Sequence, residues 1–410
     1  MKQLLQATNH AVACALNDRA FLILENCTME LLAASVPTTT TTTTTTTEET
    51  TIKDTNNTEQ NDDSDDQPTH DTIQAVAVME HLDGTIWCAV SRFHKTLALY
   101  QITNKDGQQQ HQHQQLEPKT VHATTKRAGC LAFSIVQDNL DIIIAGDLTG
   151  DATAFPLDKS NHKGRLLLGH TASMLTGVRV ACQGTILLTC DRDEKVRISQ
   201  FPTTTIIQGY LLGHKAFVSC MDVAMIWCVT CGGDSTVRLW NITTFRELSQ
   251  IDTQDKLPTR VAMSLKGSFV AVIYEGSLIL EIYRINNSTM ALMKRQQCSA
   301  QPLAVVFSTD SNFFVLLGAP DYLVSYFIES DNVIPKEGTF SALQKLAKDI
   351  TMPTSVMEMD KNGIIKLKKL SEERGPAKEK PWNRVERIQT SREGNARRNK
   401  KRRQGDNVDH

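Results

Sequence analysis

Short apolar stretches of strand length recur along most of the chain, and tight turns containing Asp, Gly or Ser join them in pairs. Residues 185–199 read TILLTCDRDEKVRIS and residues 226–242 read IWCVTCGGDSTVRLWNI, so each contains a strand, a turn and a second strand. Apolar runs of about six residues, rich in β-branched side chains and bounded by turn residues, are typical of strands rather than helices. The pattern therefore predicts a succession of antiparallel hairpins.

Two neighbouring segments, starting at Leu166 and Leu211, repeat the same order of features. Each has a Gly-His pair, a strand, a second strand, a turn with Asp, and then Val-Arg followed by an aliphatic residue. The two histidines are 44 residues apart and the two turn aspartates 41 residues apart. This is the period of a four-stranded propeller blade.

The same turn recurs, less faithfully, near Asp18, His94, Asp151, Glu275 and Asp321, which gives seven turns in all. Two early spacings are too long, but residues 33–71 contain a run of threonines and an acidic stretch, and residues 104–120 are rich in Gln and His. Such polar tracts bury too little apolar surface to order themselves, so we expect disordered inserts. The prediction is an all-β, seven-bladed β-propeller over residues 1–335.

The chain after the last predicted strand has a different composition. Residues 341–350, SALQKLAKDI, predict a short amphipathic helix within a connecting segment at 336–371. Residues 372–410 predict a basic disordered tail. From Lys366 to Arg403 there are fifteen Lys or Arg against five Glu, whereas the whole chain carries a net charge of −2. The tail is therefore electrostatically distinct from the rest.

Several classes of function lack support in the sequence. No apolar run approaches the ~18 residues that cross a bilayer, and we expect neither a signal peptide nor a membrane anchor. The ten cysteines are irregularly spaced, which favours reduced thiols, and the CxxC of Cys228 and Cys231 has no second ligand pair for zinc. Signatures of phosphate loops, HExxH metalloproteases and GxSxG hydrolases are missing. We expect no catalytic residue, metal or cofactor.

The Gly-His histidines invite a catalytic interpretation, because each repeat also supplies an Asp and a hydroxyl. The alternative is a structural network, since a WD-repeat propeller joins such a histidine to the turn Asp, a strand hydroxyl and a Trp inside each blade. We favour the structural role. In the second repeat the residues are His214, Thr230, Asp234 and Trp240. In the first they are His170, Thr189 and Asp193, with Ser199 where the second repeat has Trp.

The turn of the first repeat is unusually charged, with six ionisable residues among seven positions from Asp191 to Arg197. Where the second repeat has Gly233, Ser235 and Thr236, this turn has Arg192, Glu194 and Lys195. A solvated turn is one interpretation. A patch of alternating sign also suits a partner surface bearing both charges. We predict a partner-binding site formed by Arg192, Glu194, Lys195 and Arg197, in which Arg197 bridges the acid of the turn and the partner.

These segments carry a family resemblance. GHTASMLTGVRV, LTCDRDEKVRIS, LLGHKAFVS and GGDSTVRLWNI resemble the WD-repeat non-catalytic subunit of eukaryotic tRNA (guanine-N7)-methyltransferase, the family called wuho in insects. The resemblance is strong over residues 165–248. It implies a propeller that docks a separate catalytic subunit as a heterodimer and supports N7-methylguanosine formation in the variable loop of tRNA. Glu194, Lys195 and Arg197 match the partner-facing part of the family pattern.

The basic tail ends in ARRNKKRR, residues 396–403. It is interpreted as a nuclear import signal or as a flexible cation that meets tRNA phosphate, and a merely solubilising end is the alternative. We expect a nuclear protein that also occurs in the cytoplasm. The alternative function is a scaffold or ubiquitin-ligase substrate receptor, which would bind varied partners. The tail residues concerned are Arg397, Arg398, Lys400, Lys401, Arg402 and Arg403.

Overall fold

The fold was analysed in a computed structural model of the 410-residue chain. The structure describes residues 5–8, 11–15, 21–25, 31–35 and 72–336, apart from 82, 103–116, 135–141, 160–161, 172 and 319–320. Within these ranges the regular elements are all strands. The same ranges therefore contain no helix long and apolar enough to cross a membrane.

The strands form seven four-stranded antiparallel sheets, and each sheet consists of four consecutive strands. Blade 1 contains β1 (Leu5–Ala7), β2 (Ala11–Ala15), β3 (Phe21–Glu25) and β4 (Leu31–Ser35). Blade 2 contains β5 (Ile73–Glu80), β6 (Ile86–Arg92), β7 (Thr96–Ile102) and β8 (Thr120–Ala123). Blade 3 contains β9 (Ala128–Ser134), β10 (Ile142–Asp147), β11 (Asp151–Pro156) and β12 (Arg165–Gly169).

The remaining four blades follow the same plan. Blade 4 contains β13 (Leu175–Ala181), β14 (Ile186–Asp191), β15 (Lys195–Gln200) and β16 (Ile207–Leu212). Blade 5 contains β17 (Val218–Ala224), β18 (Trp227–Gly232), β19 (Thr236–Asn241) and β20 (Arg246–Asp252). Blade 6 contains β21 (Pro258–Met263), β22 (Phe269–Tyr274), β23 (Ile279–Asn286) and β24 (Thr289–Gln297). Blade 7 contains β25 (Pro302–Phe307), β26 (Asn312–Leu317), β27 (Leu323–Glu329) and β28 (Asn332–Pro335).

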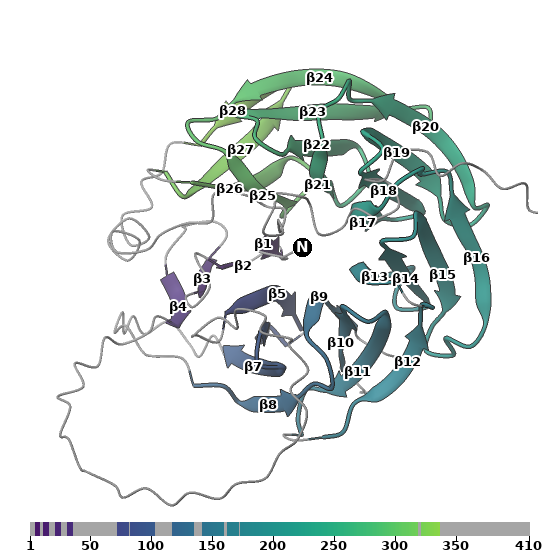
Figure 1. The fold of residues 1–410 in the computed structure, drawn as a ribbon. Coiled ribbons are helices and arrows are strands. Elements are labelled where there is room, and N and C mark those ends of the chain that lie inside the picture. The colour runs from purple at the N-terminus through teal and green to yellow at the C-terminus, as the bar shows by residue number, and fades with distance from the viewer. Residues whose placement is uncertain are drawn as a thin grey trace, which may run out of the picture. The chain divides into compact units, whose positions relative to one another are not determined.

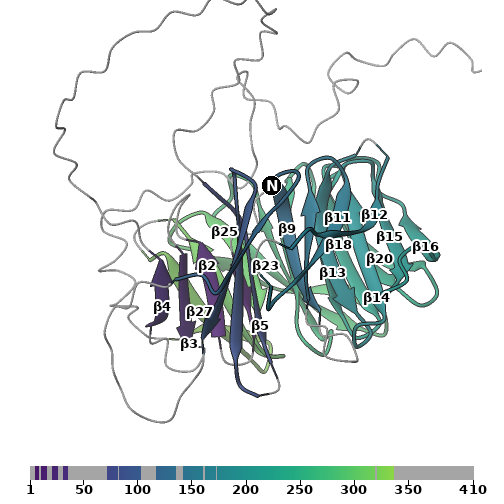
Figure 2. The same ribbon diagram turned by 90° about the horizontal axis from the view of Figure 1, so that it is seen from below.

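The first strand of each blade lies nearest the centre of a ring, and the fourth lies at its perimeter (Figure 1). Figure 2 shows that the strands run from one face of the ring to the other. Because successive strands are antiparallel, all turns between second and third strands lie on one face. The predicted seven-bladed, all-β propeller is therefore confirmed.

The ring closes by packing rather than by sharing a strand. Strand β1 lies against β5 of blade 2 and β25 of blade 7. Leu5 and Val12 of blade 1 belong to the same buried cluster as Leu303 and Phe314 of blade 7. Burial of apolar surface between the first and last blades thus holds the two ends of the ring together.

Adjacent blades bury the two faces of each sheet, as alternation along a strand requires. In blade 4, Val196 and Ile198 pack toward blade 5, where Trp240 is a large member of the shared cluster. Cys228 belongs to this cluster, whereas Cys231 belongs to the cluster between blades 5 and 6. The two cysteines of the CxxC therefore point to opposite faces of their sheet.

The predicted limits of the two inserts need correction. Strand β4 runs to Ser35, so the first three residues assigned to the insert at 33–71 belong to a strand. Strand β8 begins at Thr120, and residues 117–119 before it are described, so the second insert ends before Glu117. The rest of both inserts, the helix expected at 341–350 and the tail from 372 lie outside the described residues.

Candidate functional site

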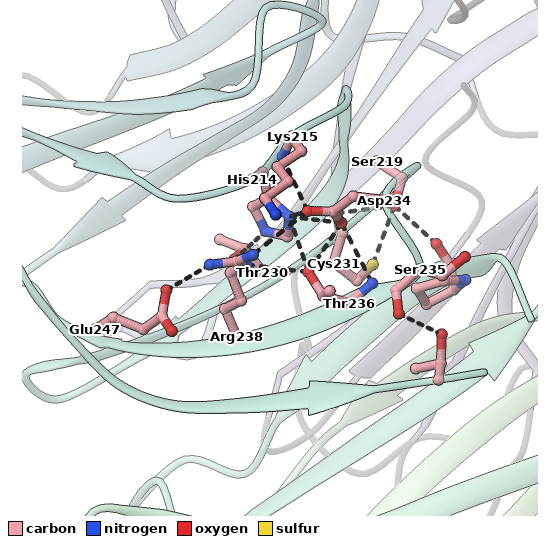
Figure 3. A network of polar contacts seen from close by, with 12 residues as sticks. His214, Lys215, Ser219, Thr230, Cys231, Asp234, Ser235, Thr236, Arg238 and Glu247 are labelled. Carbon is pink, nitrogen blue, oxygen red and sulfur yellow. Dashed lines mark hydrogen bonds and ion pairs between the residues drawn. The ribbon is translucent and has the colours of Figure 1, made fainter. Parts of the chain in front are cut away.

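A buried polar network crosses blade 5 (Figure 3). The Nδ1 atom of His214 lies 3.0 Å from Oδ1 of Asp234, and its Nε2 atom lies 2.8 Å from Oγ1 of Thr230. The indole of Trp240 donates to the same Thr230 hydroxyl at 2.8 Å. The structure thus brings together the four residues predicted for this blade. The network joins the loop before the blade to its second and third strands.

Asp234 is the centre of this network. Its carboxylate also accepts hydrogen bonds from the Thr236 hydroxyl at 2.8 Å and the Lys215 amide at 3.0 Å, and it lies 3.6 Å from Arg238. Burial alone raises the pKa of a carboxyl, but the hydrogen bond and charge of His214 outweigh it and lower the pKa of Asp234 to about 2. Every polar atom here has a structural partner, as expected for a network that stabilises the blade.

Blade 4 has a related network with a different acid. His170 Nδ1 lies 2.7 Å from Oδ2 of Asp191, and its Nε2 lies 2.7 Å from the hydroxyl of Thr189. The prediction that Asp193 fills this role was wrong. The carboxylate of Asp191 instead accepts a hydrogen bond from the Asp193 amide at 2.8 Å.

Backbone geometry explains why the acid moves two positions. Asp191 ends β14, and the aligned residue of blade 5 is Gly232. A Cβ atom built on Gly232 would lie 2.9 Å from Nδ1 of His214, so a side chain at that position points at the histidine. Blade 5 has a glycine at this position, and the carboxylate that contacts its histidine belongs to Asp234. Blade 4 has the carboxylate of Asp191 at this position instead. The presence of Asp191 where the next repeat has Gly232 was the sequence feature that indicates this change of acid.

Lys195 completes the blade 4 network. Its ammonium lies 2.9 Å from Oδ2 of Asp191, whose side chain is fully buried, while the Lys195 side chain remains 31% exposed. Burial raises the pKa of Asp191, but hydrogen bonds from His170 and Lys195 outweigh this effect and leave the pKa below its usual value. The charges of the turn are tolerated partly because the buried carboxylate of Asp191 lies within bonding distance of both His170 and the Lys195 ammonium.

Arg197 follows the turn in β15, and its side chain bonds to groups of blade 4 and to the end of β12 in blade 3. Its guanidinium donates to Ser199 Oγ at 2.9 Å and to the Thr204 carbonyl at 2.9 Å, with a longer bond of 3.4 Å to the Gly169 carbonyl. Buried Ser199, in the place of the blade 5 tryptophan, therefore serves as an acceptor for Arg197. The predicted bridge from Arg197 to an acid of the turn is replaced by these three bonds.

The other predicted partner-binding residues lie at the surface of the turn. Arg192 and Glu194 are both partly exposed, and the Arg192 amide donates to the Met174 carbonyl at 3.0 Å. Glu194 has a φ of 75°, and the aligned Ser235 of blade 5 has a φ of 56°, so both turns have the same left-handed residue. The two turns thus share a backbone conformation and differ in the side chains that they present.

Blade 6 contains a buried network that the sequence analysis missed. The carboxylate of Glu281 accepts hydrogen bonds from Tyr274 at 2.5 Å, Tyr283 at 2.6 Å and Arg295 at 3.0 Å. Burial raises the pKa of Glu281, but the hydrogen bonds from the two tyrosines outweigh this effect and lower it. The only hint was a glutamate in the apolar strand LILEIY, flanked by tyrosines.

The described residues offer no site for other chemistry outside these networks. No three His, Cys, Asp or Glu side chains among the described residues are grouped so as to hold a metal ion. The two histidine networks are buried and fully engaged in their blades. The basic residues from Arg397 to Arg403 lie outside the described residues.

Comparison with known families identifies the region around the charged turn. Residues 158–323 match the family model described as the tRNA methyltransferase TRM82 WD40 domain. This match covers blades 4, 5 and 6 and parts of their neighbours. The resemblance inferred from the sequence is confirmed by this match and by the relatives below.

Three curated relatives carry related names. The tRNA (guanine-N(7)-)-methyltransferase non-catalytic subunit wdr4 of Danio rerio is 30% identical over 223 residues, which cover 50% of this chain and 53% of the relative. Its Homo sapiens counterpart WDR4 is 30% identical over 187 residues, covering 42% and 45%. The wuho subunit of Drosophila pseudoobscura pseudoobscura is 38% identical over 120 residues, covering 28% and 29%. The chain spans about half or less of the length of these relatives.

Solved structures support the architecture alone. A chain of the Mitotic Checkpoint Complex superposes with a TM-score of 0.55 at 16% identity, covering 82% of this chain and 89% of the other. The β-propeller domain of Myceliophteria_thermophila Cps50 (Swd1) superposes with a TM-score of 0.59 at 8% identity, covering 80% and 96%. At such low identity the likeness concerns the propeller fold and not the function.

Proposed function

We propose that this chain is the non-catalytic propeller subunit of a heterodimeric tRNA (guanine-N7)-methyltransferase, required for N7-methylguanosine formation in the variable loop of tRNA. The relatives named as such subunits and the match over residues 158–323 support this proposal. The single observation that supports docking of a catalytic subunit is the charged turn of blade 4, which lies within the matched region.

The turn is suited to hold one constant folded partner. Glu194 and Lys195 are adjacent, opposite in charge and partly exposed, whereas the turn of blade 5 presents Ser235 and Thr236 there. A partner that places a cation at Glu194 and a carboxylate near Lys195 gains orientation and specificity from the pair of charges. Lys195 already meets Asp191, so it would share its ammonium between the blade and the partner.

The chain's own residues leave the chemistry to the partner. The His-Asp-hydroxyl sets that resemble catalytic groups form the interior of blades 4 and 5, where each ring nitrogen has a bonded neighbour. Their role is to fix the loop before each blade against the turn that carries the charges. The subunit thus acts as a rigid platform for the catalytic subunit, and tRNA reaches the complex through that subunit or through the basic tail.

The test compares one substitution at equivalent positions of two blades. Glu194→Lys should prevent co-purification with the methyltransferase subunit and abolish N7-methylguanosine in tRNA, because the new lysine meets a partner cation. Ser235→Lys puts lysine at the matching left-handed position of blade 5 and should leave both readouts unchanged. Melting temperatures of the two variants should stay near that of the native chain, since neither side chain is buried.

Two results would contradict the proposal. Normal stoichiometry of the Glu194→Lys complex would make the turn a solvated loop. A native chain that fails to bind a tRNA (guanine-N7)-methyltransferase subunit, and instead captures diverse proteins, would favour a scaffold or ubiquitin-ligase receptor.

We also propose that the segment from Arg397 to Arg403 directs the protein to the nucleus. Its composition, six basic residues among seven, is the support. The same charges would attract tRNA phosphate in a salt-dependent manner.

A further inference from the structure

Two exposed apolar side chains lie directly beside the charged turn. Leu212 is 67% exposed and Tyr210 is 38% exposed, and both belong to β16 at the perimeter of blade 4. In the register of the sheet, Leu212 is paired with Lys195 and Tyr210 with Arg197. Paired residues of antiparallel strands project to the same face, so the two apolar side chains flank the basic ones.

Lys195, Arg197, Tyr210 and Leu212 lie on the face of the blade 4 sheet that is directed toward blade 3. Val196, Ile198 and Leu211 alternate with the four residues above and are buried against blade 5. On the opposite face, the Arg197 guanidinium reaches the Gly169 carbonyl at the end of β12. Tyr210 and Leu212 therefore continue the surface that begins with the charged turn, toward the perimeter of the ring.

The next two blades along the chain have polar residues at the corresponding positions, whereas blade 3 has Gly169 and Leu166 there, and Leu166 is 60% exposed. In blade 5, Thr236 is paired with Asp252 and Arg238 with Gln250. In blade 6, Ile279 is paired with Gln297 and Glu281 with Arg295. All four of these outer-strand residues are exposed, as expected for positions that face water. Relative to blades 5 and 6, the replacement of polar residues by Tyr and Leu occurs in the blade whose turn also carries the additional charges, and Leu166 of blade 3 extends the apolar character toward that blade.

We infer that Tyr210 and Leu212 form the apolar half of the docking surface for the methyltransferase subunit, next to the ionic half formed by Glu194 and Lys195. The inference rests on the proposed function. The partner segment that fits is an amphipathic one, with an apolar side chain for the Tyr210–Leu212 patch, a cation for Glu194 and a carboxylate for Lys195. Apolar contacts surrounded by charges exclude water, which strengthens the adjoining ion pairs.

The test uses exposed apolar residues on the two faces of the ring. Leu212→Ser and, as a second variant, Tyr210→Gln, which installs the residue of blade 5, should each weaken binding of the purified methyltransferase subunit at least tenfold. Met225→Ser is the matched control. Met225 is 68% exposed in the turn between β17 and β18, which lies on the opposite face of the ring, and its loss should change the affinity less than twofold.

The combined variant tests whether the two halves act as one surface. Leu212→Ser together with Glu194→Ala should weaken binding by less than the product of the single effects, because neighbouring groups in one interface are coupled. Melting temperature is measured for every variant, and all should match the native chain because both side chains are exposed. Affinity is measured by calorimetry or surface plasmon resonance with the full-length chain.

The outcomes separate this inference from the proposed function. If the native chain binds the methyltransferase subunit and both patch variants bind equally well, the inference is overturned while the proposed function stands. Failure of the native chain to bind overturns the proposed function first. If the isolated chain forms a dimer that Leu212→Ser dissociates, the patch belongs to a second copy of this chain, and the inference is overturned as well.

Discussion

The correction from Asp193 to Asp191 leads to a sharp prediction. Replacing Asp191 by asparagine should destabilise the propeller, whereas the same replacement of Asp193, two residues along the same turn, should have little effect. Both changes remove one negative charge from the same turn, so they have equal effects on net charge. The difference between them therefore isolates the buried carboxylate.

The magnitude follows from the contacts of Asp191. Its oxygens lie 2.7 Å from His170 Nδ1, 2.9 Å from Lys195 Nζ and 2.8 Å from the Asp193 amide. Removing one partner of a buried ion pair costs about 3 to 5 kcal/mol, because the remaining charge loses its compensation. Asparagine keeps one acceptor oxygen for the turn amide, so we expect a loss of about 2 to 4 kcal/mol. Asp193→Asn, at a partly exposed position, should cost less than about 1 kcal/mol.

Thermal unfolding followed by circular dichroism measures both variants. For a propeller of this size, a loss of about 2 to 4 kcal/mol corresponds to a fall in Tm of roughly 3 to 6 °C. Equal Tm values for the two variants would refute the assignment of Asp191. A larger fall for Asp193→Asn would show that the histidine of blade 4 follows the pattern of blade 5 after all.

Three further predictions concern other parts of the chain. Glu281→Gln should lower the free energy of unfolding by about 2 to 3 kcal/mol, because two buried tyrosine hydroxyls and Arg295 lose a charged acceptor, and Tm measures the loss. The pKa of Asp234 is about 2 in the folded chain and about 4 in the unfolded chain, so its carboxylate contributes about 1 to 2 kcal/mol to the free energy of unfolding. This contribution is complete above pH ~4 and is lost as the pH falls through ~2. Unfolding midpoints measured across this pH range would reveal the loss. Deleting residues 400–403 should move a fluorescently tagged chain out of the nucleus and lower the salt slope of tRNA binding by about 0.7 to 0.9 per lost phosphate contact, whereas an unchanged location and slope would favour a solubilising tail.

The number of blades was predictable because a propeller repeats a local unit. The turns near Asp151, Asp193, Asp234 and Glu275 recur 41 or 42 residues apart, and each blade is a meander of four consecutive strands. Such meanders depend on contacts between residues close in the sequence, which periodicity in the sequence records directly. The network of His214, Thr230, Asp234 and Trp240 was predictable for the same reason, since it lies within one repeat and the loop before it.

The parts that could not be predicted depend on where side chains point in three dimensions. Alignment equates Asp193 with Asp234, yet the direction of a side chain at the end of β14 makes Asp191 the partner of His170. In the Glu281 network the carboxylate is bonded by tyrosines from two different strands instead of by a histidine. No spacing rule connects them. Likewise, the end of β4 at Ser35 depends on pairing with β3, which the low-complexity composition that follows concealed.

The structure also changes how the charged turn must be tested. A reversal of both Glu194 and Lys195 looks harmless from the sequence, because both are surface residues. Lys195, however, neutralises the buried Asp191, so Lys195→Glu would place a second carboxylate beside it and destabilise blade 4. Loss of the partner in such a variant would follow from unfolding as readily as from a lost contact. Glu194 is the left-handed residue of the turn and is partly exposed, so a substitution there, with the melting temperature as its control, is the better way to separate docking from folding.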